Sequence, residues 1–118
     1  MKPFRKMFVP NYNYRFSVEQ LETLADEVVF VCECPMFDDM LGEEQAERFE
    51  GRIVDKMKGF DPKNDCIAFY GDVMVFALMV YFIGGEHEEF SIARFSSKRN
   101  EYVVRKIKDD LFAQFEEK

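Results

Sequence analysis

The sequence predicts an α/β fold, specifically a three-layer α/β/α sandwich built on a mostly parallel sheet. Short apolar runs of strand length alternate along the chain with segments of helical periodicity, as they do in α/β proteins. The runs are continuously apolar, which is typical of parallel strands buried on both faces. With 118 residues, the chain is long enough to form one domain, residues 1–118, with its own core.

The first strand is expected at residues 6–10 (KMFVP), and the second at residues 28–32 (VVFVC). Between them, Ser17 and Gln20 form a capping box, a pattern that starts many helices. The apolar stripe of this helix is Val18, Leu21, Leu24 and Ala25.

After a loop at residues 35–42, an amphipathic helix is expected over residues 43–59. Its apolar residues recur at spacings of three and four, opposite a face of Glu and Lys. They are Ala46, Phe49, Ile53, Val54, Met57 and Phe60.

The most apolar stretch, residues 64–85, is expected to contain a strand at 66–70 and a helix at 73–83. A membrane span needs about 20 continuous apolar residues. Gly71 and Asp72 interrupt this stretch, so we do not expect it to cross a membrane. Asp72 is expected to cap the start of the helix, and the glycine pair after residue 83 to end it. The side of the helix expected to face the sheet is Val73, Phe76, Ala77, Val80 and Ile83.

Residues 90–95 (FSIARF) and 102–107 (YVVRKI) are expected to form a hairpin, followed by a short helix at 109–117. A helix between consecutive strands favours parallel pairing through right-handed crossovers. The expected sheet therefore has four parallel strands in the order 2-1-3-4, with residues 102–107 added antiparallel at its edge.

Apolar residues also occupy the flanks and outer side of helix 73–83, where a surface helix normally carries Lys or Glu. They are Met74, Leu78, Met79, Tyr81 and Phe82. This surface needs cover, either from residues 109–117 or from a second copy of the protein. We favour a homodimer, because the helix at 109–117 is short and covers only part of the surface.

Charge is distributed unevenly along a chain whose net charge is −7. Residues 1–16 carry four bases and no acid, residues 17–90 carry 18 acids against five bases, and residues 91–108 carry six bases against one acid. The acidic middle disfavours direct nucleic-acid binding of the basic-groove type. It permits binding of a protein partner through an acidic surface.

Familiar catalytic and cofactor motifs are missing from the sequence. Neither G-x-G-x-x-G nor G-x-x-x-x-G-K-[ST] occurs. Cys32 and Cys34 do not form a C-x-x-C pair, and Cys66 does not complete a zinc site with them. His87, the single histidine, follows a glycine pair that we expect to be a loop, which would hold a general base poorly. We therefore expect no catalytic residue, metal or cofactor.

The carboxyl ends of the parallel strands are the remaining place for a small-molecule site. Asn11 and Asn13 can hydrogen-bond to a base or sugar, and Tyr12 can stack on it. The other candidates follow the second and third strands and are Glu33, Gly71 and Asp72. A simple turn also explains residues 11–13, since Asn favours turns on its own account, and we favour that interpretation.

Several features occur together in the chain: a strand ending in Pro-Asn, the runs VVFVCE and DCIAFYGD, an acidic helix, and a final FSIARF…NEYVVRKI hairpin. In this pattern, with Asn11 and Gly71 its most sharply placed residues, the chain resembles a group of small α/β proteins encoded by tailed bacteriophages. The PMFDDMLG loop and the Cys-x-Cys depart from the pattern. The resemblance implies the fold and a viral setting, and it implies no mechanism.

Two functions stand as hypotheses. The favoured one is a non-catalytic accessory protein of phage type that binds a host or phage protein through its acidic surface. The other is a nucleotide or small-metabolite binding protein, with or without catalysis, whose site lies at the strand ends. The basic start of the chain is not followed by a long apolar segment, so we expect the protein in the cytoplasm, that of the host cell if a phage encodes it.

Overall fold

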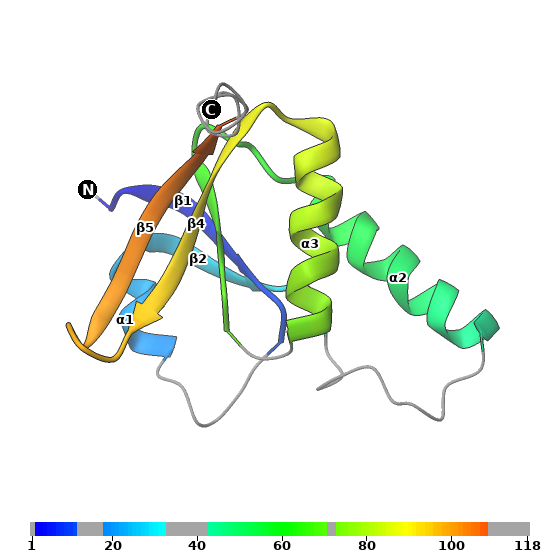
Figure 1. Ribbon diagram of the computed structural model, residues 1–118, viewed down its shortest axis with the longest axis horizontal. Helices are drawn as coiled ribbons and strands as arrows, with labels where there is room; N and C mark the ends of the chain where they lie inside the picture. Colours follow the sequence, from blue (N-terminus) through cyan, green and yellow to red (C-terminus); the bar gives the residue numbers. More distant parts are fainter. Residues whose placement is uncertain (1, 12–17, 33–42, 71–72, 109–118) are drawn as a thin grey trace, which may run out of the picture.

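A five-stranded sheet forms the middle layer of the protein in the computed structural model, which describes residues 2–11, 18–32, 43–70 and 73–108 (Figure 1). The strand order is β2-β1-β3-β4-β5, as expected from the sequence. The elements are β1 (Phe4–Val9), α1 (Val18–Glu22), β2 (Ala25–Phe30), α2 (Glu43–Met57), β3 (Asp65–Ala68), α3 (Val73–Glu86), β4 (Glu89–Ser96) and β5 (Glu101–Lys108). The helix expected at residues 109–117 lies outside the described residues.

Strands β1 to β4 are parallel to their neighbours, and β5 runs antiparallel to β4, so the predicted α/β fold is confirmed. Met7 in β1 pairs with Val28 on one side and with Cys66 on the other. The carboxyl halves of β1 (MFV) and β2 (VVF) are apolar, as is usual for parallel strands covered on both faces, whereas their first halves carry charged residues. The β4–β5 pair is longer and continuous from Glu89↔Lys108 to Ser96↔Glu101.

The two faces of the sheet bury separate apolar clusters, so the molecule has three layers. Met7 and Val9 pack with Leu21 of α1 on one face, while Phe8 packs on the other face with α2 and α3. This alternation follows from the two-residue repeat of a strand. Figure 1 accordingly shows α1 on one side of the sheet and α2 and α3 on the other.

The boundary between α1 and β2 differs from the prediction, which gave Leu24 and Ala25 to the helix. The helix ends at Glu22, where the Thr23 hydroxyl donates a hydrogen bond of 2.6 Å to the Gln20 carbonyl. A side chain that bonds to the backbone in this way competes with the helical pattern. Ala25 instead begins β2 and pairs with Phe4 of β1.

Helix α3 continues through Gly84 and Gly85 to Glu86, so the predicted end at the glycine pair is wrong. Neither glycine has the positive φ of a left-handed cap. The buried side of α3 matches the predicted one only in part: Ile83 is buried, and Phe76 and Val80 pack partly buried against the core, but Ala77 is exposed. The fully buried residues of the helix are Val75, Met79 and Ile83, whereas Val73 is 63% exposed.

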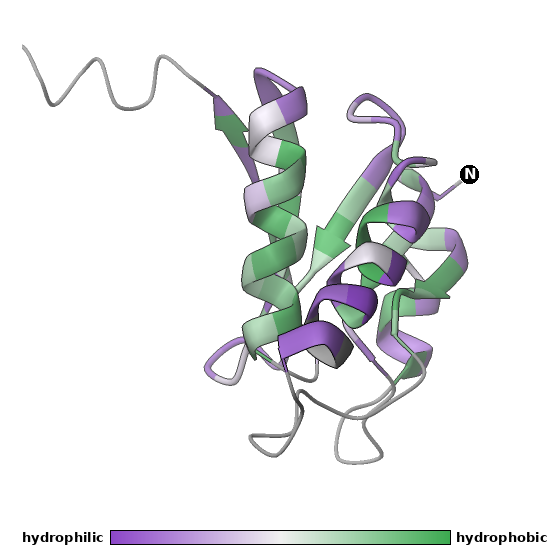
Figure 2. Ribbon diagram, turned by 90° about the vertical axis from the view of Figure 1, so that its right-hand side faces the viewer, coloured by the Kyte–Doolittle hydropathy of each residue, from purple (hydrophilic) through white to green (hydrophobic). Residues whose placement is uncertain are grey.

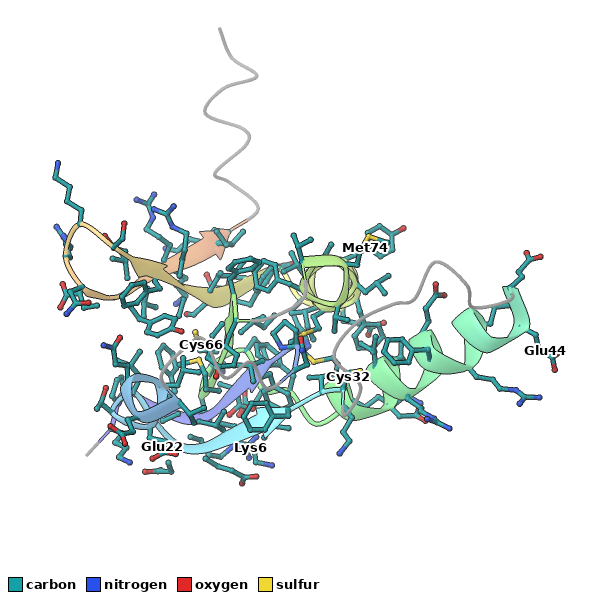
Figure 3. The ribbon with its side chains drawn as sticks, turned by 90° about the horizontal axis from the view of Figure 1, so that it is seen from below. Lys6, Glu22, Cys32, Glu44, Cys66 and Met74 are labelled. Carbon is teal, nitrogen blue, oxygen red and sulfur yellow. The ribbon has the colours of Figure 1, made fainter. Side chains whose placement is uncertain are left out.

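Helix α2 packs on the rest of the molecule mainly through its second half, and in its first half Phe49 is partly buried against the core. Ile53 and Met57 are buried, but most of the described side chains before them are exposed. In Figures 1 and 3, the first half of α2 projects beyond the edge of the sheet. This projecting half is part of the site described next.

Candidate functional site

The strand order creates a switch point between β1 and β3. From β1 the chain passes through α1 to β2 on one side, and from β2 it returns through α2 to β3 on the other. In open α/β sheets, ligands bind beyond the carboxyl ends of the strands at such a point. The predicted candidate Asn11 follows β1 there and is 4% exposed. Asn11 is therefore buried at this edge of the sheet.

The other five candidates at the strand ends lie outside the described residues. They are Tyr12, Asn13, Glu33, Gly71 and Asp72. A residue that the sequence analysis did not single out, Tyr70, follows β3 and is fully buried, with its ring 6.5 Å from that of Phe30. The described part of this edge is therefore packed with aromatic side chains.

A groove of about 330 Å³ lies between α2 and α3. Its walls are apolar, with Ile53 and Val54 from α2 facing Leu78 and Phe82 from α3. Its charged lining residues, Glu50 and Glu86, are acidic. Tyr81 and Gly85 complete the lining. No local sequence pattern places these residues together, because the pairing of two helices depends on the folded arrangement.

A second groove, of about 450 Å³, lies on the other side of α2, beside the end of β2. Its apolar lining comes from Val31, Cys32, Phe49 and Ile53. Its charged lining is mixed, with Arg52 and Lys56 beside Asp55. Helix α2 is thus flanked on both sides by apolar surface open to solvent.

The first half of α2 is strongly acidic. Its exposed carboxylates are Glu43, Glu44, Glu47 and Glu50, against one base, Arg48. The Arg48 guanidinium forms an ion pair of 2.9 Å with Glu44, and both side chains are largely exposed. Figure 3 shows Glu44 at the far end of the helix. We call residues 43–50 the acidic half of α2.

The outer side of α3 is apolar, as Figure 2 shows for the face of the helix turned to the viewer. Two of the residues predicted to lie there, Met74 and Tyr81, are 59% and 84% exposed. Leu78 and Phe82 are half-buried and line the groove beside α2. Met79 is fully buried against the sheet, so its predicted outer position is wrong.

A buried carboxylate that was not predicted from the sequence lies at the start of β3, at the end of the strand opposite to the switch point. Asp65 accepts hydrogen bonds from Arg5 Nε (3.1 Å) and Nη2 (2.8 Å), and from the backbone N–H groups of Lys6 (3.1 Å) and Asp61 (2.8 Å). Asp65 holds β1, β3 and the turn before β3 together. Nearby, hydrogen bonds from the Asn64 side chain and the Lys63 N–H lower the pKa of Asp61.

The described thiols do not form a reactive site. Cys32 and Cys66 are buried, and Cys34 lies outside the described residues. Burial raises the pKa of the Cys66 thiol to about 12. Among the residues that the structure describes, no group of three or more His, Cys, Asp and Glu side chains is placed to hold a metal ion.

His87 directly follows α3 and does not lie in a glycine loop. Its N–H donates to the Ile83 carbonyl (2.9 Å), and its ring lies 6.2 Å from that of Phe60. These contacts give His87 a structural role at the end of α3.

Comparisons with family models, curated proteins and solved structures found no match to this chain. Within the described ranges, no helix has both the length and the apolar character needed to span a membrane.

Proposed function

We propose that the protein is a non-catalytic accessory protein of phage type, which binds a host or phage protein through the acidic half of α2. The observation that carries this proposal is the exposure of four glutamates on a helix half that projects from the sheet. The protein acts in the cytoplasm of the host cell, a setting that rests on the resemblance in sequence pattern.

The surface has the two properties that a protein-binding site needs. Its carboxylates attract a basic partner and increase the rate of encounter. The grooves on either side of α2 offer apolar side chains, among them Phe49 and Leu78, for the water-excluded contacts at the centre of an interface. The partner is therefore expected to present basic residues around an apolar group.

Affinity capture from a bacterial lysate tests the proposal when wild type is compared with two charge-reversal variants. Glu47→Lys/Glu50→Lys changes the acidic half of α2. Glu22→Lys/Glu27→Lys makes the same change of charge at exposed positions on α1 and β2, on the other side of the molecule (Figure 3). We expect a stoichiometric partner that the second variant retains and the first one loses.

Two results would contradict the proposal. One is that wild type captures no stoichiometric partner even at low salt, where charge attraction is strongest. The other is that Glu47→Lys/Glu50→Lys captures the same partner in the same amount as wild type.

A nucleotide or small metabolite is the second candidate, and the switch point between β1 and β3 favours it. A screen of thermal stability against nucleotides tests this candidate. A ligand present at 100 times its dissociation constant stabilises the folded state by about 2.7 kcal/mol, which raises the melting temperature visibly. No shift with any nucleotide would remove the nucleotide from this candidate and leave the first candidate unaffected.

A further inference from the structure

Four exposed residues on the outer side of α3 recur at spacings of three, four and three: Met74, Ala77, Tyr81 and Gly84. These are the a and d spacings of a heptad repeat, through which one helix packs against another. The buried residues Val75, Met79 and Ile83 lie on the opposite side of the same helix. We call the four exposed residues the outer seam of α3.

The sizes of the seam residues alternate along the helix. Met74 and Tyr81 are large, while Ala77 and Gly84 are small. When two helices pack antiparallel, a positions of one face d positions of the other. In a two-fold pair of α3 helices, Met74 then faces Gly84 of the second copy, and Tyr81 faces Ala77 of the second copy. Each large side chain meets a small one, and the symmetry makes each contact twice.

Electrostatics also fit this arrangement. No charged residue occurs between residues 73 and 85, so the two seams meet without repulsion between like charges. Within α3, no acid lies in the first turn and no base in the last. The carboxyl end of the helix dipole therefore lacks a compensating base, and an antiparallel neighbour places opposite dipole ends side by side.

We propose that a second copy of this chain covers the outer seam, with the two α3 helices antiparallel about a two-fold axis. The acidic groove residues Glu50 and Glu86 lie beside the seam and would repel an anionic membrane surface, which disfavours lipid as the occupant. The proposal concerns a different face from the acidic half of α2 and does not depend on the proposed function.

Sedimentation velocity at micromolar concentration tests the proposal with two complementary charge variants. Ala77→Glu and Tyr81→Lys each place a charge in the seam. Each alone is expected to raise the dimer dissociation constant at least ~10-fold, because the charge loses water opposite an apolar group. When the two variants are mixed in equal amounts, Glu at 77 faces Lys at 81 of the other chain, and the dimer returns. Ser97→Glu, at an exposed turn position, is the charge-matched control and stays dimeric.

The expected dimer mass is twice the chain mass of 14.0 kDa. Circular dichroism checks that each variant is folded, and Met74→Lys with Gly84→Glu gives a second complementary pair if the first does not fold. Wild type that stays monomeric at about 100 μM overturns the proposal, since the outer seam would then be left without its second copy even far above the concentration of the test. Single variants that dimerise like wild type overturn it too. A folded pair whose mixture stays monomeric overturns the antiparallel arrangement.

Discussion

Asp65 shows how one residue connects distant parts of this chain. It is the only fully buried carboxylate in the described residues, and it accepts four hydrogen bonds from two segments, β1 and the turn before β3. The Arg5 side chain that pairs with it is half exposed, so only one of the two charges is fully withdrawn from water. Nothing in the sequence marks Asp65, because Arg5 lies 60 residues away and meets it only when β1 and β3 are adjacent.

The change Asp65→Asn is expected to destabilise the fold by about 2–4 kcal/mol. The amide removes the negative charge opposite Arg5 and turns one acceptor into a donor that faces N–H groups. Urea denaturation measures the effect. Asp55→Asn is the control, because its ion pair with Lys58 is exposed on both sides, and it should change stability by less than about 0.5 kcal/mol. Equal effects of the two changes would contradict this role of Asp65.

Cys66 is expected to resist alkylation in the folded protein. Iodoacetamide reacts with the thiolate, and burial raises the pKa of this thiol from its ordinary 9.0 to about 12. Peptide mass spectrometry after treatment at pH 8 should find Cys66 unmodified in native protein and modified after unfolding in guanidinium. Modification at the unfolded rate in native protein would contradict the burial.

The same pKa gives a pH dependence of stability. A raised folded-state pKa stabilises the fold fully below the unfolded value of 9.0, and this contribution is lost as the pH rises toward 12. Tyr102, whose pKa burial raises to about 12, adds to the loss above its ordinary value of 10.0. Both groups therefore contribute to alkaline unfolding.

At the scale of elements, the sequence predicted every described helix and strand, but many ends were displaced by one to three residues, and those of α1 and α3 were misplaced for identifiable reasons. Continuous apolar runs identified the strands because these are covered on both faces. The end of α1 was misplaced because Leu24 and Ala25 continue the helical spacing. In the fold, Ala25 pairs with β1 and therefore belongs to β2. Helix α3 runs through Gly84 and Gly85 because the helix is anchored by burial of Ile83, which outweighs the low helix propensity of glycine.

Helix α2 contains a glycine of its own, Gly51, where the buried half of the helix meets the projecting half. A Cβ at this position would have no heavy atom within 4 Å. Gly51→Ala should therefore stabilise the helix by about 0.5–1 kcal/mol and slow amide hydrogen exchange in residues 43–51 roughly two- to fivefold. Gly59→Ala, outside the helix and equally open, should leave that exchange unchanged. No slowing in Gly51→Ala would contradict the helical state of this half.

At the scale of the whole molecule, strand order could be predicted but the grooves beside α2 could not. The order follows from the alternation of elements and from the handedness of crossovers. The groove between α2 and α3 depends on how far α2 projects past the sheet, which no local pattern encodes. The inner side of α3 was misjudged for a related reason, since a helix that is apolar all round has no polar face to mark the outside.

The fold also separates the charges of the sequence in space. The basic residues of 91–108 belong to the β4–β5 hairpin, at one edge of the sheet, and the acidic half of α2 projects at the other end of the molecule (Figure 1). Ion pairs such as Lys106–Glu89 (3.3 Å) compensate part of the basic edge. This separation supports the proposal that a basic partner binds α2 and not β5.

Amide hydrogen exchange of the protein, alone and with its captured partner bound, tests most directly whether α2 is the binding surface. Binding through the acidic half of α2 predicts slower exchange in residues 43–51 and no change around residues 9–11 and 68–70 at the ends of β1 and β3. Slower exchange at those strand ends, with residues 43–51 unchanged, would contradict the account and favour a site at the switch point.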